Sequence, residues 1–374
     1  MSDCRTQRMI LKEVKRFAKD RIAPIAGEID ETADFPSDTV AGMGRIGLTG
    51  ILIPEAYGGT YTDHLTYYWT VRELARCCSS HAMILLSHSL CANLINLLGS
   101  PQQKEFYLSR LAAGEWLGAC AMTEPQAGSD LGSIETVAER HKDTYILNGH
   151  KHFITNGANS DIVVVLAATS RQETLFNKSL FIVPKSLPGF DIGRSENKMG
   201  VRASETTELF FNSVRVPAQN LIGGEGQGML GILEAVDCSR VAIASIALGI
   251  AESAFDAAQN YSKQRKQFGE PIGNFDAIRF YLAEMATDIE CSRLLIENTA
   301  RLQARKKRHS KQASMAKVFT TEMAFKTVSK AMQIHGGYGY IKDYPLERWL
   351  RDVRLFMIVE GTSEIQKRMI AKHL

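Results

Sequence analysis

The spacing of apolar residues changes along the chain, and in its first part the spacing is helical. Apolar residues in the segment 10–22 recur every three to five positions, which is the stripe of an amphipathic helix. Residues 38–46 continue the helical pattern, and residues 65–98 indicate two well-buried helices. Pro101 stands where the first turn of a further helix tolerates proline. We therefore expect an N-terminal helical domain over residues 1–118.

The middle of the chain has the pattern of short strands. Runs of β-branched or aromatic residues at 143–150, 162–168, 180–184 and 207–217 are bounded by Gly, Pro, Asn and Ser. Strands of this length separated by turns favour a small antiparallel barrel or sandwich. The pattern predicts a central β domain over residues 119–222.

The last part of the chain returns to long helices. Residues 251–265, 275–302 and 311–334 are rich in Ala, Leu, Met and Glu and are joined by short connections. We expect a C-terminal four-helix bundle over residues 223–374. The chain as a whole is predicted to be mainly α, with a central β domain between two helical ones.

Composition and charge narrow the class of protein. Apolar residues make up 45% of the chain and charged residues 23%, as in ordinary globular proteins. The net charge is only +3, so no basic field favours nucleic acid. Apolar stretches such as 162–168 and 241–250 are too short to cross a membrane. The chain enters a charged helical pattern in its first residues, so we expect no signal peptide and a cytoplasmic location.

Cysteine and histidine positions give no metal-binding pattern. The seven cysteines are scattered, and none forms a Cys-x-x-Cys pair, which fits reduced thiols in a cytosol-like compartment. His141, His150 and His152 have no cysteine at ligand spacing. We therefore expect no metal site.

Two segments far apart in the chain carry the chemistry. Residues 122–130 read Met-Thr-Glu-Pro-Gln-Ala-Gly-Ser-Asp, and residues 360–366 read Glu-Gly-Thr-Ser-Glu-Ile-Gln. Together, and in this order, they resemble the two signature segments of the acyl-CoA dehydrogenases, which use FAD to remove two hydrogens from an acyl thioester. The resemblance covers nearly the whole chain, and the family's fold has the same α–β–α order.

The most important single residue is Glu360. Removing a proton next to a thioester carbonyl needs a base, and a carboxylate serves if burial raises its pKa. An apolar run, residues 356–359, precedes Glu360. The alternative is that Glu360 caps the next helix or pairs with Arg351 or Arg354. The resemblance implies that Glu360 takes the α-proton while hydride leaves the β-carbon for flavin. Some family members carry the base at the position of Ser239. This chain has a serine there, so Glu360 has no competing carboxylate at that position.

The resemblance also implies a substrate site. Asp237 and Arg240 resemble the family's contacts to the CoA thioester, although an intrahelical Asp–Arg pair is the simpler alternative. Ser129 and Gly361 complete the residues expected to contact substrate.

The expected flavin site is assembled from several motifs. Phe153 and Thr155 belong to a Phe-Ile-Thr-Asn strand in which phenylalanine replaces the family's usual tryptophan. Two glycine-containing loops resemble those that reach the pyrophosphate of FAD in a neighbouring subunit, and either could instead be a plain helix connection. The full set implied by the resemblance is Cys120, Met122, Thr123, Ser129, Phe153, Thr155, Arg265, Phe268, Gln333, Gly336, Gly337, Thr362 and Glu364.

These implications form one functional hypothesis. The protein is expected to convert an acyl-CoA into its trans-2-enoyl-CoA with FAD as cofactor and electron-transfer flavoprotein as partner. Loops that reach across subunits imply a homo-oligomer, a dimer or a tetramer. Three alternatives stay open: a dehydrogenase of carrier-protein thioesters, an acyl-CoA oxidase, and a non-catalytic flavin- or CoA-binding relative. The length and branching of the acyl group are open too.

Overall fold

The computed structural model describes residues 4–60, 63–170 and 177–374, and its first part is helical. As expected, residues 65–98 form two helices. The second, α5, is buried on nearly every side, whereas Asp63 caps the first by accepting a hydrogen bond from the Thr66 N–H at 2.7 Å. The helices of this part are α1 (Cys4–Phe17), α2 (Ala26–Thr32), α3 (Ser37–Arg45), α4 (His64–Cys77), α5 (Ser79–Leu98), α6 (Pro101–Gln103) and α7 (Ser109–Ala112).

The middle part forms one sheet, with strand order β6-β7-β3-β2-β4-β5-β8 and β1 beside β4. Most neighbouring strands are antiparallel, but β1 and β2 each pair with β4 in parallel. The expectation of wholly antiparallel pairing was therefore wrong at β4, whose two parallel partners are reached through loops and not through hairpins. The strands are β1 (Gly118–Ala121), β2 (Val137–His141), β3 (Thr144–Thr155), β4 (Ile162–Ala168), β5 (Lys178–Pro184), β6 (Phe190–Ser195), β7 (Thr206–Pro217) and β8 (Leu221–Ile222).

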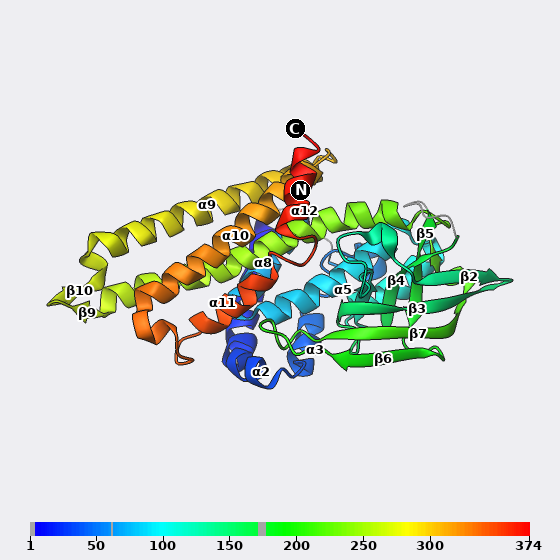
Figure 1. Ribbon diagram of the computed structural model, residues 1–374, viewed down its shortest axis with the longest axis horizontal. Helices are drawn as coiled ribbons and strands as arrows, with labels where there is room; N and C mark the ends of the chain where they lie inside the picture. Colours follow the sequence, from blue (N-terminus) through cyan, green and yellow to red (C-terminus); the bar gives the residue numbers. More distant parts are fainter. Residues whose placement is uncertain (1–3, 61–62, 171–176) are drawn as a thin grey trace.

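The last part is a set of long helices that extends away from the sheet. Figure 1 shows the sheet at one end of the molecule and the short hairpin of β9 and β10 at the other, with α8, α9 and α10 side by side between them. Helix α8 begins well before the expected start at residue 251. The elements are α8 (Gly228–Gln264), β9 (Lys266–Gln267), β10 (Glu270–Pro271), α9 (Asp276–Ala304), α10 (Ser310–His335), α11 (Leu346–Leu355) and α12 (Ser363–Ala371).

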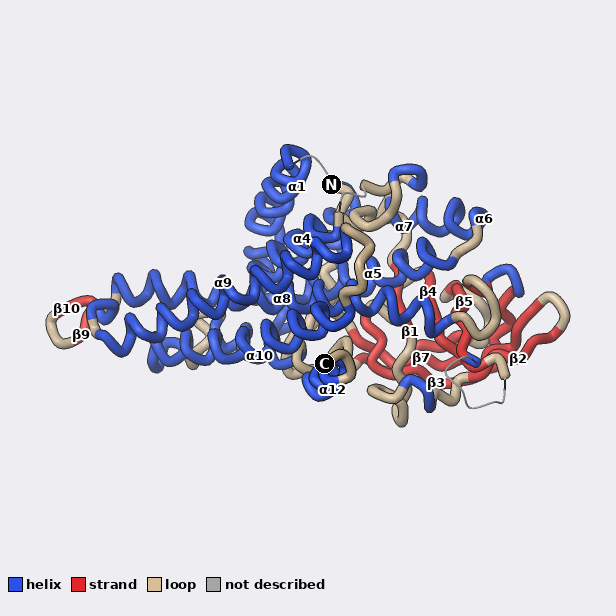
Figure 2. The backbone as a smooth tube through the Cα atoms, turned by 90° about the horizontal axis from the view of Figure 1, so that it is seen from above, coloured by secondary structure: helices blue, strands red, loops and turns tan. Residues whose placement is uncertain are grey.

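Helix α5 joins the helical part to the sheet. Its Leu94 and Ile95 lie in one apolar cluster with Val164 of β4, Ile182 of β5 and Ile232 of α8. The seen-from-above view in Figure 2 shows α5 running from the helices onto the sheet. Burial of these side chains fixes the sheet against the helices, and the candidate site lies where the two meet.

Helices α5 and α8 are long and apolar enough, by length and composition, to span a membrane. Most of each apolar window is inside the protein, 78% for α5 and 72% for α8. Both are therefore explained as core helices, which pass the same test.

Candidate active site

Glu360 lies in the short connection between α11 and α12, in a backbone conformation that few side chains adopt. Its φ is +54°, and that of the following Gly361 is +88°. Two hydrogen bonds from Gln366 hold the turn: its side chain donates to the Glu360 carbonyl at 3.0 Å and to the Gly361 carbonyl at 2.9 Å. Lys317 Nζ donates to the same Gly361 carbonyl at 2.7 Å. A β-carbon on Gly361 would meet Gln366 Nε2 at 2.7 Å, so this arrangement requires glycine.

The Glu360 carboxylate faces residues from four other elements. Ser239 of α8 donates from Oγ to Glu360 Oε2 at 2.6 Å. Burial raises the pKa of Tyr67 on α4, and the charge of Glu360 adds to that rise. Burial also raises the pKa of the Cys120 thiol on β1, again with a contribution from Glu360. On α10, the charge of Glu360 acts to raise the pKa of Lys317. The charge of Glu360 thus acts on β1, the strand that leads into residues 122–129, the expected flavin loop.

Lys317 is a part of the site that the motif analysis missed. Its side chain is buried, and burial lowers its pKa to about 8 while the charge of Glu360 acts in the opposite direction. A lysine this far inside a helix bundle is unusual and needs a partner. The signal that could have found it is the pair Ala313 and Thr321, which lie four residues to either side on the same face of α10 and are buried.

Asp237 and Arg240 both lie on α8 and pair with one another. Arg240 donates from Nη1 to Asp237 Oδ1 at 2.9 Å, and Ser310 of α10 donates to the other carboxylate oxygen. The pair is the intrahelical one considered above. It nevertheless leaves a donor over, because the buried Nε of Arg240 has no hydrogen-bond partner in the described parts of the chain. An unsatisfied donor at this place fits a ligand that carries acceptors.

The expected flavin loop is fastened to β3 by a buried ion pair. Lys151 donates to Glu124 Oε1 at 2.7 Å and to the Met122 carbonyl at 3.0 Å. Next to it, the His152 N–H donates to the Thr123 carbonyl at 2.9 Å. Met122 and Thr123 are therefore brought beside β3, one to two residues before Phe153. No sequence motif indicates Lys151 or its pairing with Glu124.

Phe153 offers a free aromatic face at this junction. The register of β3 against β7 slips between Lys151 and Ile154, and Phe153 takes a φ of +59°. Its side chain is 60% exposed, which is unusual for a phenylalanine in a sheet. Two residues on, the Thr155 carbonyl is fixed by Ser87 of α5 at 3.1 Å. An exposed ring beside backbone polar groups fits a planar ring system such as flavin.

A cavity of about 610 Å³ lies between Ser129 and α12. Besides Ser129 it is lined by Ile365, Met369 and the cationic Arg368 and Lys372. Two cationic side chains suit phosphate groups, and both FAD and CoA carry them. At the start of α12, Thr362 caps the helix by accepting from the Ile365 N–H at 3.4 Å. Glu364 is exposed in the same first turn.

Five of the residues expected to contact flavin lie near the C-terminal ends of α8 and α10, far from Glu360. Arg265 and Phe268 follow the end of α8, and about 26 residues of that helix separate Arg265 from Ser239, or about 39 Å. Phe268 is 95% exposed. Gln333, Gly336 and Gly337 form the end of α10 on the same side, since Arg265 lies over the ring of Tyr338 at 5.9 Å. Within one chain these five do not reach the residues around Glu360.

Two helical domains with a sheet between them, and a half-buried carboxylate where they meet, fit a flavin-dependent dehydrogenase of acyl thioesters. The sequence carries the three domains of one family: the acyl-CoA dehydrogenase N-terminal domain matches residues 5–115, the middle domain residues 119–214 and the C-terminal domain residues 226–374. The chain therefore belongs to the acyl-CoA dehydrogenase family, and it is an enzyme that acts on CH–CH groups with FAD as cofactor.

Similar proteins extend over almost the whole chain. A short-chain-specific acyl-CoA dehydrogenase of Clostridium acetobutylicum is 44% identical over 98% of this chain and 97% of its own. The butyryl-CoA dehydrogenase structure from Megasphaera elsdenii has a TM-score of 0.96 at 39% identity, covering 98% of this chain and 97% of that one. A chain in a structure of the electron-transferring flavoprotein of Acidaminococcus fermentans also has a TM-score of 0.96, at 41% identity and the same coverage.

A more distant structure bears on the cofactor. The glutaryl-CoA dehydrogenase of Mycobacterium smegmatis in complex with FADH2 is 29% identical, with a TM-score of 0.93 over 98% of this chain and 94% of that chain. The predictions of family, fold class and FAD are thereby confirmed.

Proposed function

We propose that this enzyme oxidises a short-chain acyl-CoA to the trans-2-enoyl-CoA, with Glu360 as the base that takes the α-proton. The observation that carries the proposal is the 2.6 Å hydrogen bond from Ser239 to the Glu360 carboxylate, in a turn whose Gly361 carbonyl accepts a hydrogen bond from the buried Lys317. The similarity to short-chain and butyryl-CoA enzymes supports a short acyl group.

The residues around Glu360 account for the proton transfer. Within the described chain no hydrogen bond uses the Glu360 N–H, so it is available to a thioester carbonyl. A donor at that place stabilises the charge that develops on the carbonyl oxygen when the α-proton leaves. Ser239 orients the carboxylate through its 2.6 Å hydrogen bond, and Lys317 and Gln366 fix the turn that carries it. FAD, when bound, supplies the acceptor for the hydride of the β-carbon.

Replacing Glu360 by glutamine tests the base. The amide keeps the shape of the side chain but cannot take the proton, so we expect reduction of the flavin by butyryl-CoA to slow by about 10³-fold or more. The measurement is anaerobic bleaching of the oxidised flavin band, with dithionite reduction as the control for intact, bound flavin. A variant that is bleached at a rate within a few-fold of wild type would show that another group is the base.

The contact between Ser239 and Glu360 offers a rescue. A carboxylate placed at Ser239 lies near the same spot, so the double variant Ser239→Glu, Glu360→Gln is expected to regain part of the lost rate. Ser239→Ala, Glu360→Gln is its matched control and is expected to stay inactive.

We propose electron-transfer flavoprotein as the electron acceptor, which the structural similarity to a chain from an electron-transferring flavoprotein structure supports. Enzyme reduced by butyryl-CoA is mixed with purified electron-transfer flavoprotein or with air. Faster reoxidation by the flavoprotein is expected. Faster reoxidation by air would show that the enzyme is an oxidase. If only thioesters of a carrier protein bleach the flavin, the acyl group is carried by that protein and not by CoA.

A further inference from the structure

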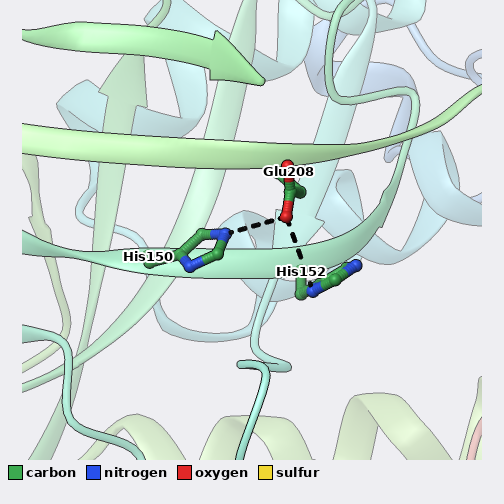
Figure 3. Close-up of side chains that lie close together, drawn as sticks. All are labelled: His150, His152 and Glu208. Atoms are coloured by element: carbon green, nitrogen blue, oxygen red, sulfur yellow. Dashed lines mark ion pairs between the residues drawn. The ribbon is translucent and has the colours of Figure 1, made fainter. Parts of the chain in front are cut away.

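Two histidines and a glutamate converge on one face of the sheet, next to Phe153, whose ring centroid is 4.0 Å from that of His152. His150 and His152 lie on β3 and point to the same side, and Glu208 of β7 lies between them (Figure 3). Glu208 Oε1 is 3.5 Å from His150 Nε2 and 3.8 Å from His152 Nδ1. One ligand atom from each of the three residues lies within 4.8 Å of the others.

The histidine nitrogens that face Glu208 are buried and lack partners. Neither His150 Nε2 nor His152 Nδ1 has a hydrogen bond to any described part of the protein. Their distances to the carboxylate exceed the length of a hydrogen bond. A buried polar atom without a hydrogen bond is unfavourable, so two of them at one carboxylate call for a ligand.

The second nitrogen of His152 decides which kind of ligand fits. His152 Nε2 lies 3.0 Å from Glu196 Oε1, and a carboxylate can only accept, so this nitrogen carries the proton. In the neutral ring Nδ1 is then a bare lone pair that faces the negative oxygen of Glu208. Two lone pairs directed at one another require a cation between them. A carboxylate on the far nitrogen of a metal-binding histidine is the usual arrangement in metal sites.

The distances suit a small divalent ion of the first transition row. Zinc binds histidine nitrogen at about 2.0–2.1 Å and carboxylate oxygen at about 2.0–2.2 Å, which places tetrahedral ligands about 3.3 Å apart. Glu208 Oε1 is 3.5 Å and 3.8 Å from the two histidine nitrogens, which lie within 4.8 Å of one another, so binding one ion draws the three side chains together. Two histidines and one carboxylate leave a fourth position, and His150, which is 32% exposed, opens it to water.

Neighbouring strands hold the three side chains in place. The ring of His150 stacks on Phe210 of β7, with centroids 4.2 Å apart and planes 17° apart. Gly193 of β6 lies over the glutamate, and a β-carbon there would meet the Cβ of Glu208 at 2.8 Å. The positions of the ligands thus follow from the pairing of β6, β7 and β3.

We propose that His150, His152 and Glu208 bind one divalent transition-metal ion, for which Zn²⁺ is the probe, and that the ion braces β3 against β7. The slip in register that turns Phe153 outward lies between Lys151 and Ile154, and so it includes His152. A metal at this point would therefore stiffen the strand that presents Phe153. The inference does not depend on the identity of the acyl substrate.

Zinc binding to the flavin-loaded, tag-free enzyme tests the proposal. Protein freed of metal with EDTA is titrated with ZnCl₂ by calorimetry, and with CoCl₂ for the visible absorption of a tetrahedral cobalt site. We expect one ion per chain, and we expect His150→Ala and Glu208→Gln each to weaken zinc binding by about 100-fold. Glu196→Gln, which touches no ligand atom facing the ion, is expected to weaken it by about 10-fold.

Two matched controls separate this site from ordinary surface binding. His141→Ala removes an exposed histidine of β2, and Cys291→Ser removes an exposed thiol, so neither is expected to change the affinity. Bound flavin per chain reports that each variant is folded. The proposal is overturned if wild type binds no zinc at micromolar concentration, or if Glu208→Gln binds zinc as wild type does. In the first case a proton, and not a metal, is the cation of the cluster.

Discussion

At the scale of single residues, the position of the Glu360 carboxylate depends on the side chains that contact its turn. Glu360 stands in a left-handed turn, and the groups that hold this turn come from distant parts of the chain: Ser239 is 121 residues before Glu360, and Lys317 is 44 residues before Gly361. The motif identified the glutamate because its neighbours in the sequence are characteristic. It could not identify Lys317, because a lysine in a helical run is ordinarily assigned to the solvent side.

Lys317→Met tests this burial through the pH dependence of stability. The folded protein releases the Lys317 proton at about pH 8, whereas an unfolded lysine keeps it to about pH 10.4. The unfolded state therefore binds more protons in this interval, and wild-type stability should rise with pH relative to the variant, by about 2–3 kcal/mol at pH 10. Below pH 8 the difference should be constant.

Urea unfolding of both proteins at pH 7 and pH 10 is the measurement, and Lys326→Met, an exposed position on the same helix, is the control. A gap between Lys317→Met and wild type that does not change with pH would mean that this lysine keeps its proton when buried.

At the scale of elements, the sequence predicted the strands β3, β4, β5 and β7 and most of the long helices, although not the first half of α8. Strand β4 has the predicted bounds 162–168, and α4 with α5 fill the predicted segment 65–98. The strands β1, β2, β6 and β8 were missed. Strands β2 and β6 are largely exposed, so they lack the apolar alternation that marks a strand. Strand β8 spans only Leu221–Ile222, too short for any pattern.

Lys151 joins two of these elements, and its removal should loosen the flavin loop. In Lys151→Met the carboxylate of Glu124 stays buried without its cation, which costs about 3–5 kcal/mol. We expect a lower midpoint of thermal unfolding and less bound FAD per chain. The double variant Lys151→Met, Glu124→Gln removes both charges and should recover much of the loss. Flavin content equal to wild type in the single variant would show that the ion pair does not position the loop.

At the scale of the whole molecule, the expected flavin residues fall into two groups at opposite ends of the bundle. Thr123, Thr155 and Glu360 lie where the sheet meets the helices, whereas Arg265 and Gln333 lie at the distant end of α8 and α10. One flavin cannot span both groups in one chain. We infer a homo-oligomer in which the distant end of one chain completes the FAD site of another.

Mixing two defective chains tests this arrangement. Arg265→Ala should weaken FAD binding in the partner's site, and Glu360→Gln should remove the base from its own site. Each variant alone is expected to be inactive. Co-expressed, they form sites with Glu360 from one chain and Arg265 from the other, and activity of the order of a quarter of wild type should return. Inactive hybrids that contain both chains would show that Arg265 serves no partner.

The sequence by itself determined the three-part order of the chain, the family and the identity of the candidate base, because these depend on local periodicity and on contiguous motifs. The tertiary structure alone decided what surrounds that base and what converges on the sheet. Ser239, Lys317 and Gln366 meet the Glu360–Gly361 turn only after the helices pack. His150 and His152 acquire a carboxylate only through the pairing of β3 with β7, which no spacing of ligands along the chain encodes.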